Sequence, residues 1–130
     1  MIKIEAQVKL CAQLQIREKA KKRAGRIMQF KEFQEWLELN SKSKEVFLGK
    51  WAASQVEKNK KRQPKKRWDE KKVLRNGLAE WKRAVTGAYD KIRGQKGMPL
   101  INGYQIWVDF MDEIGFIEMF DDSISELELE

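Results

Sequence analysis

The sequence predicts a mainly α-helical protein, a single-domain bundle of four to five helices with the option of a short N-terminal β-strand. Two observations support this prediction. Apolar residues recur at helical spacing in several segments. The chain has 130 residues and is 42% hydrophobic, which is enough for one core without disulfides or metals. We expect a basic helical domain over residues 1–120 and an acidic C-terminal tail over 121–130.

The first sixteen residues carry their apolar side chains on even positions, from Ile2 to Ile16. A period of two is typical of a β-strand. Sixteen residues without a turn is long for a strand, and the second half is rich in helix formers. Two interpretations stay open. One is a strand over 2–9 with a helix starting near 11–13, and the other is one continuous buried helix.

Three helical segments are expected before residue 60. The first is very basic and runs from 17 to about 25, and the second covers 30–39. The residues 40–43 then form a helix stop and a cap, with Ser41 or Ser43 as the N-cap. In the second segment, the inward residues are Phe30, Phe33 and Leu37, with Trp36 and Leu39 beside them. In the third, over 44–59, they are Val46, Phe47 and Trp51, with Ser54 and Val56 as further candidates.

The segment 68–94 has the clearest helical pattern. Six apolar residues follow a 4-3-4-3-4 spacing and lie within about 80° of arc on a helix. They are Leu74, Leu78, Trp81, Val85, Ala88 and Ile92. Gly94 suits the position after the helix end. A loop over 95–103 should precede a last helix, whose inward residues are Tyr104, Trp107, Val108, Met111 and Ile114.

Charge is unevenly distributed along the chain. Residues 1–16 carry +1, residues 17–97 carry +15 and residues 98–130 carry −9, which gives the net charge of +7. The last of these segments contains no Lys or Arg. A basic body with an acidic end predicts a polyanionic partner and a charged tail.

The strongest functional signal is the stretch 57–72, with nine Lys and Arg, three acids and Pro64. Proline disfavours helix in the residue before it, so we expect an exposed junction between two helices. Clustered cations attract phosphate backbones, whereas the alternative is a solvated helix face. Trp68 could stack on an unpaired base or pack the junction. The predicted nucleic-acid-binding residues are Arg17, Lys21, Lys22, Arg23, Arg26, Lys60, Lys61, Arg62, Lys65, Lys66, Arg67, Trp68, Lys72, Arg75, Lys82, Arg83 and Arg93.

Catalysis has little support in the sequence. The chain has no histidine and one cysteine, Cys11, which argues against histidine-based catalysis and zinc sites. We expect no cofactor and no metal. Asp69, Glu80 and Lys82 follow the order of a magnesium-dependent nuclease site, but they are expected on a helix instead of on strands. A second acidic set, Asp109, Asp112 and Glu113, is better explained as an exposed face.

The sequence therefore predicts a non-enzymatic protein that binds DNA or RNA. The alternative is a small adaptor or inhibitor that docks on a larger, nucleoprotein-like partner. The acidic tail could keep the chain in solution, compete with nucleic acid for the basic face, or dock a protein. No apolar run reaches membrane length and no secretory signal opens the chain, so we expect an intracellular, reducing location in cytoplasm, nucleoid or nucleus, with no membrane partner.

Overall fold

The computed structural model describes residues 27–129. Its elements in chain order are α2 (Phe30–Asn40), α3 (Ser43–Lys61), the 3₁₀ turn η1 (Pro64–Lys66), α4 (Glu70–Lys96), α5 (Gly103–Glu113) and α6 (Phe116–Glu126). Five α-helices and no strand in this part of the chain confirm the mainly α bundle. The strand considered for 2–9 lies outside the described residues.

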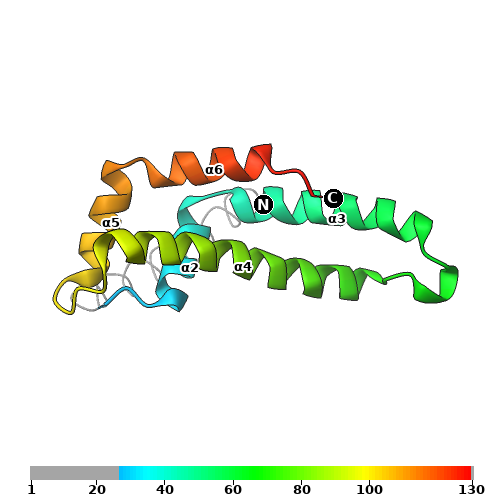
Figure 1. The fold of residues 1–130 in the computed structure, drawn as a ribbon, viewed down its shortest axis with the longest axis horizontal. Helices are drawn as coiled ribbons and strands as arrows, with labels where there is room; N and C mark the ends of the chain where they lie inside the picture. The colour runs from blue at the N-terminus through cyan, green and yellow to red at the C-terminus, as the bar shows by residue number, and fades with distance from the viewer. Residues whose placement is uncertain (1–26, 130) are drawn as a thin grey trace, which may run out of the picture.

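Helices α3 and α4 form a long antiparallel hairpin (Figure 1). With 27 residues, α4 is about 40 Å long at 1.5 Å per residue. Helix α6 lies along α3, while α2 and α5 pack near the end of α4 that is far from the turn between α3 and α4. The hairpin extends beyond the end of α6, so its turn stands apart from the rest of the bundle (Figure 1).

Aromatic side chains dominate the core. Phe33 and Trp107, both 0% exposed, pack against Tyr89 with ring centroids 5.5 and 5.1 Å from that of the tyrosine. Trp81 of α4 packs on Phe47 of α3 with ring centroids 5.8 Å apart, and it joins the same core through Phe120 at 5.9 Å. Such edge and tilted arrangements are favoured by the ring quadrupoles. Phe33 and Leu37 of α2, and Tyr104, Trp107 and Met111 of α5, are buried as predicted.

The predicted apolar seam of α4 is correct in its second half and wrong in its first. Trp81, Val85, Ala88 and Ile92 are buried, whereas Leu74 and Leu78 are 53% and 40% exposed. Gly77 faces α3 in their place. A Cβ on Gly77 would lie 2.7 Å from Trp51 Cδ1, so the two helices approach closely here.

The inward face of α3 also differs from the prediction. Phe47 is buried, but Val46 and Val56 are 39% and 55% exposed. Gln55, which no apolar pattern would select, is only 2% exposed. Its Oε1 accepts a hydrogen bond from Arg62 Nη2 at 3.3 Å, which gives the buried amide a partner.

Two helix ends differ from the predicted positions. Helix α4 continues past Gly94 to Lys96, and Gly97 (φ 66°) is its C-cap, with its N–H donating to the Arg93 carbonyl. Helix α3 begins at Ser43, and its N-cap is Lys42 instead of a serine. The Ser41 hydroxyl still accepts a bond from the Ser43 N–H at 3.0 Å, so it satisfies one of the free donors at this end.

The acidic C-terminal segment is part of the bundle, and the boundary placed after residue 120 falls inside α6. Ile124 is 5% exposed, because Phe116, Phe120 and Ile124 lie on one helical face. Asp121 accepts hydrogen bonds from the hydroxyls of Ser41 and Ser43. The prediction of an acidic tail beginning at residue 121 was therefore wrong.

Candidate nucleic-acid interface

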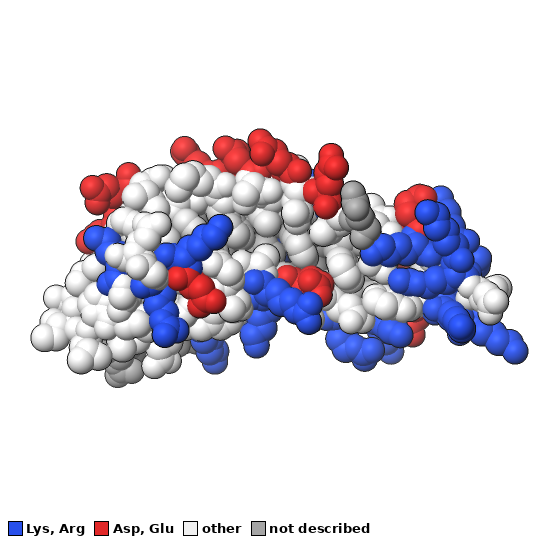
Figure 2. All heavy atoms as spheres, viewed as in Figure 1, with Lys and Arg blue, Asp and Glu red and all other residues white. Residues whose placement is uncertain are grey.

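The turn of the α3–α4 hairpin gathers the densest positive charge of the described chain. We call residues 57–72 the cationic tip. Figure 2 shows Lys and Arg covering this end of the molecule. Its exposed cations are Lys60, Lys61, Lys65, Lys66, Arg67, Lys71 and Lys72, while Lys58 and Arg62 are half-buried. Lys58 and Lys71 were absent from the predicted set, although they lie in the same stretch.

Local sequence explains why the chain turns here. Helix α3 ends at Lys61, and Pro64 opens η1, where its fixed φ and missing N–H cost nothing. Asp69 is the N-cap of α4, and its side chain accepts from the Lys72 N–H at 2.7 Å. This bond gives Asp69 a structural role at the position where a nuclease carboxylate was considered.

Asn59 holds the cationic tip together. Its side-chain Nδ2 donates to the Trp68 carbonyl at 3.1 Å, and its Oδ1 accepts from the Trp68 N–H at 3.0 Å. The same Oδ1 accepts from Arg62 Nη1 at 2.8 Å, and its backbone carbonyl accepts from Arg67 Nε at 2.9 Å. Asn59 was not predicted as a functional residue from the sequence. The only sequence signal for its role is that Asn side chains often hydrogen-bond to the backbone beside turns.

Trp68 packs within the cationic tip. The guanidinium carbon of Arg62 lies 4.5 Å from its ring centroid, and the Lys72 ammonium lies 4.8 Å from it. Cations at such distances are attracted to the ring quadrupole. The indole is half-buried, so packing of the junction, one of the two predicted roles, is what the structure shows, and the stacking role stays a prediction.

An apolar groove runs between α3 and α4 beside the cationic tip. Its volume is about 450 Å³, and we call it the arm groove. It is lined by Leu48, Trp51, Ala52, Val56, Asn59, Trp68, Glu70, Val73 and Leu74. Two of the five tryptophans of the chain therefore lie on this one surface.

The outer face of α4 extends the positive charge away from the tip. Arg75, Lys82, Arg83 and Arg93 are exposed, as the helical pattern predicted. Lys72 and Arg93 are separated by about 30 Å of helix at 1.5 Å per residue, so these cations form a stripe instead of a compact pocket. Arg83 pairs with Glu80 at 2.9 Å on an exposed surface, which contributes little to stability. The predicted cations Arg17, Lys21, Lys22, Arg23 and Arg26 lie outside the described residues.

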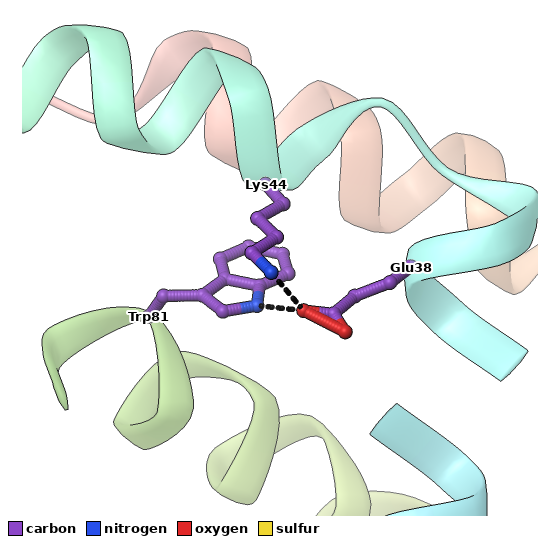
Figure 3. Close-up of polar contacts among 3 residues, drawn as sticks. All are labelled: Glu38, Lys44 and Trp81. Atoms are coloured by element: carbon purple, nitrogen blue, oxygen red, sulfur yellow. Dashed lines mark hydrogen bonds and ion pairs between the residues drawn. The ribbon is translucent and has the colours of Figure 1, made fainter. Parts of the chain in front are cut away.

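A partly buried contact fixes which face of α4 is turned outward. Glu38 Oε1 accepts from Trp81 Nε1 at 3.1 Å and pairs with Lys44 Nζ at 2.8 Å (Figure 3). These three residues belong to α2, α4 and α3. Because Trp81 is 1% exposed, its position determines that Lys82 and Arg83 point to solvent.

Negative charge collects on the opposite side of the molecule. Figure 2 shows Asp and Glu along the edge formed by α5 and α6. The acids are Asp109, Asp112 and Glu113 on α5, and Glu118, Asp121, Asp122 and Glu126 on α6. The described part of the chain thus has a basic tip and stripe on one side and an acidic edge on the other.

Within residues 27–129, no group of three or more His, Cys, Asp or Glu is placed to hold a metal ion. In the same part of the chain, no helix is both long and apolar enough to cross a membrane. Comparison with protein-family models, with curated proteins and with solved structures finds no match to this chain.

Proposed function

We propose that this protein is a non-enzymatic nucleic-acid-binding protein, whose cationic tip and outer α4 face contact phosphates. The observation that carries the proposal is the ordered turn at residues 57–72. Nine cations stand there at the projecting end of a helical hairpin. Two hydrogen bonds between the Asn59 side chain and the Trp68 backbone fix the turn that presents them.

Physical chemistry favours a phosphate partner for this end of the molecule. Clustered like charges repel each other, so the cationic tip is a cost to folding unless a partner neutralises it. A phosphate backbone does so and releases counterions, which makes binding strongly salt-dependent. Arg67 uses only its Nε in the bonds to the Asn59 and Arg62 carbonyls, so its two terminal nitrogens can form a bidentate pair with phosphate.

The test compares two double charge reversals of equal size. Lys65→Glu with Lys66→Glu alters η1 at the tip, and Lys31→Glu with Lys42→Glu alters exposed lysines elsewhere in the bundle. Fluorescence anisotropy with labelled oligonucleotides measures the Kd of each. We expect the tip variant to lose about tenfold or more in affinity and the control only a small fraction of that.

Salt dependence gives a second reading from the same titrations. With four to six phosphate contacts, a plot of log affinity against log salt should have a slope of about −3 to −5. Equal losses in the two variants, or no binding to DNA or RNA at low salt, would contradict the proposal.

The acidic edge favours one alternative, a protein-interaction factor that docks on a basic partner surface. A triple variant tests this alternative by neutralising three exposed acids of α6, with Glu118→Gln, Asp122→Asn and Glu126→Gln. If that variant no longer forms a stoichiometric complex with a protein partner, while the variant with Lys65→Glu and Lys66→Glu still does, the acidic edge is the binding surface. Removing the whole segment is a poorer test, because Ile124 belongs to the core.

A further inference from the structure

We infer that the ligand is a single-stranded nucleic acid, one unpaired base of which enters the arm groove beside the cationic tip. This inference rests on the proposed function and names the class of nucleic acid that the site takes. It is carried by the juxtaposition of an apolar, tryptophan-lined groove with the cations that would hold the backbone.

The arm groove leaves apolar side chains in water. Val56 and Leu74, which line it, are 55% and 53% exposed. Such exposure between two packed helices has a cost to the free protein unless something covers it. A volume of about 450 Å³ is within the size range of sites that take small flat ligands.

Both indoles in the groove are held in place before any ligand arrives. Trp51 Nε1 donates to the Val73 carbonyl at 2.9 Å, which ties α3 to α4. The Trp68 backbone is held by Asn59, and its indole packs against Arg62 and Lys72. Fixed aromatic surfaces suit base stacking, which tolerates any base because every base has a π-face.

The cations complete the match to a nucleotide. Arg62 and Lys72 lie within 5 Å of the Trp68 ring centroid, at 4.5 and 4.8 Å. A base against this tryptophan carries its own phosphate through a single sugar, so that phosphate comes close to both cations. In a duplex the bases are paired and stacked, and only the phosphates could engage the tip.

The experiment measures the Kd of the full chain for a single strand and for a duplex of equal length at one salt concentration. Ala52→Leu fills the arm groove without changing charge. Ala53→Leu is the matched control, because it lies next to it on α3, is also exposed and does not line the groove. Trp68→Leu removes the ring and keeps an apolar side chain.

We expect wild type and Ala53→Leu to prefer the single strand by about tenfold. Ala52→Leu and Trp68→Leu should lose most of this preference, while the duplex affinity of Ala52→Leu stays within about twofold of wild type, since its phosphate contacts are retained. Equal affinities of wild type for both ligands, or equal behaviour of Ala52→Leu and Ala53→Leu, would overturn the inference.

Failure of the inference is distinguishable from failure of the proposed function. If binding is lost in the variant with Lys65→Glu and Lys66→Glu but is unchanged when the groove is filled, the proposed phosphate binding holds and the inference of a base in the groove is wrong. If the protein binds no nucleic acid at all, both the proposed function and the inference are wrong. If an acidic amphipathic peptide binds wild type but not Ala52→Leu, and single-stranded nucleic acid does not bind in the groove, the groove is a site for a protein partner and the inference is wrong.

Discussion

At the scale of single residues, Glu38 connects three helices through one carboxylate oxygen. Glu38→Ala leaves the buried Trp81 N–H without this acceptor, which should lower the free energy of unfolding by about 1–3 kcal/mol. Glu38→Gln keeps an oxygen for Trp81 and should cost less. Lys44→Met removes only a partly exposed ion pair and should cost about 1 kcal/mol or less.

Urea unfolding followed by tryptophan fluorescence measures all three variants. If Lys44→Met destabilises the protein as much as Glu38→Ala does, the ion pair and not the indole bond is the important contact.

Gly77 gives a prediction in which local propensity and packing oppose each other. In an exposed helix interior, Gly→Ala stabilises by about 1 kcal/mol. At Gly77 the new methyl would lie 2.7 Å from Trp51, so we expect a net loss of about 1–3 kcal/mol. Gly87→Ala on the same helix has nothing within 4 Å of the added Cβ and should stabilise the fold. Equal effects at the two positions would contradict the close packing of α3 on α4.

Tyr89 should make stability depend on alkaline pH. Burial raises the pKa of its phenol above the usual 10.0, with Asp90 and Glu32 adding to the shift and Arg93 opposing it. Its hydroxyl donates to the Met28 carbonyl at 3.0 Å. The folded state therefore favours the neutral phenol, and this contribution is full below pH 10 and is lost as the pH rises through the higher folded pKa.

Ultraviolet titration of tyrosinate measures this effect directly. Tyr89→Phe should remove the late-titrating step and flatten the alkaline loss of stability. A late-titrating step that remains in Tyr89→Phe would contradict the assignment.

At the scale of elements, the cationic tip depends on Asn59. Asn59→Ala removes two hydrogen bonds to the Trp68 backbone and one from Arg62. We expect the turn to open locally while the bundle stays folded, because stability is not uniform along a chain. Limited trypsin digestion should then cleave this Lys- and Arg-rich turn several-fold faster.

Asn76→Ala is the control for this prediction. Asn76 also donates its amide to a carbonyl, that of Lys72, but from within α4. Faster cleavage of the turn in Asn76→Ala than in Asn59→Ala would show that Asn59 does not order the tip.

The element-scale predictions from sequence succeed where one face of a helix is buried by its neighbours throughout. The apolar spacing on α5 identified Tyr104, Trp107 and Met111, and all three are buried. On α4 the pattern fails at Leu74 and Leu78, because the close approach of α3 at Gly77 selects a different face. The apolar pattern of one helix does not show where the helix that packs against it will lie.

The same limit explains the error at the acidic end. Residues 121–126 have a strongly charged composition, which favoured a tail. The buried Ile124, and Asp121 held by two serines eighty and seventy-eight positions earlier, belong to contacts distant in sequence. Composition gives the charge of such a segment but not the surface that it packs against.

At the scale of the whole molecule, the sequence predicted the charge of the candidate site but not its geometry. The exposed junction around Pro64 and the outward cations of α4 follow from local pattern. The role of Asn59, the burial of Gln55 and the groove with Trp51 arise only when α3 and α4 come together. The resulting molecule separates a basic tip and stripe from an acidic edge (Figure 2).

Under the proposed function, we expect this separation to orient the molecule on a polyanion. The acidic edge repels phosphates and the projecting hairpin meets them first, so binding should involve one end of the protein. The extent of the stripe on α4, about 30 Å of helix, sets how much backbone one molecule could follow.

The most direct test of this account is an amide NMR titration of the full chain with a short oligonucleotide. We expect the largest shifts at residues 57–75 and along the outer face of α4, with small ones in α5 and α6, and all of them reversed by added salt. Shifts concentrated in α5 and α6, or no shifts at low salt, would contradict the claim that the cationic tip binds nucleic acid.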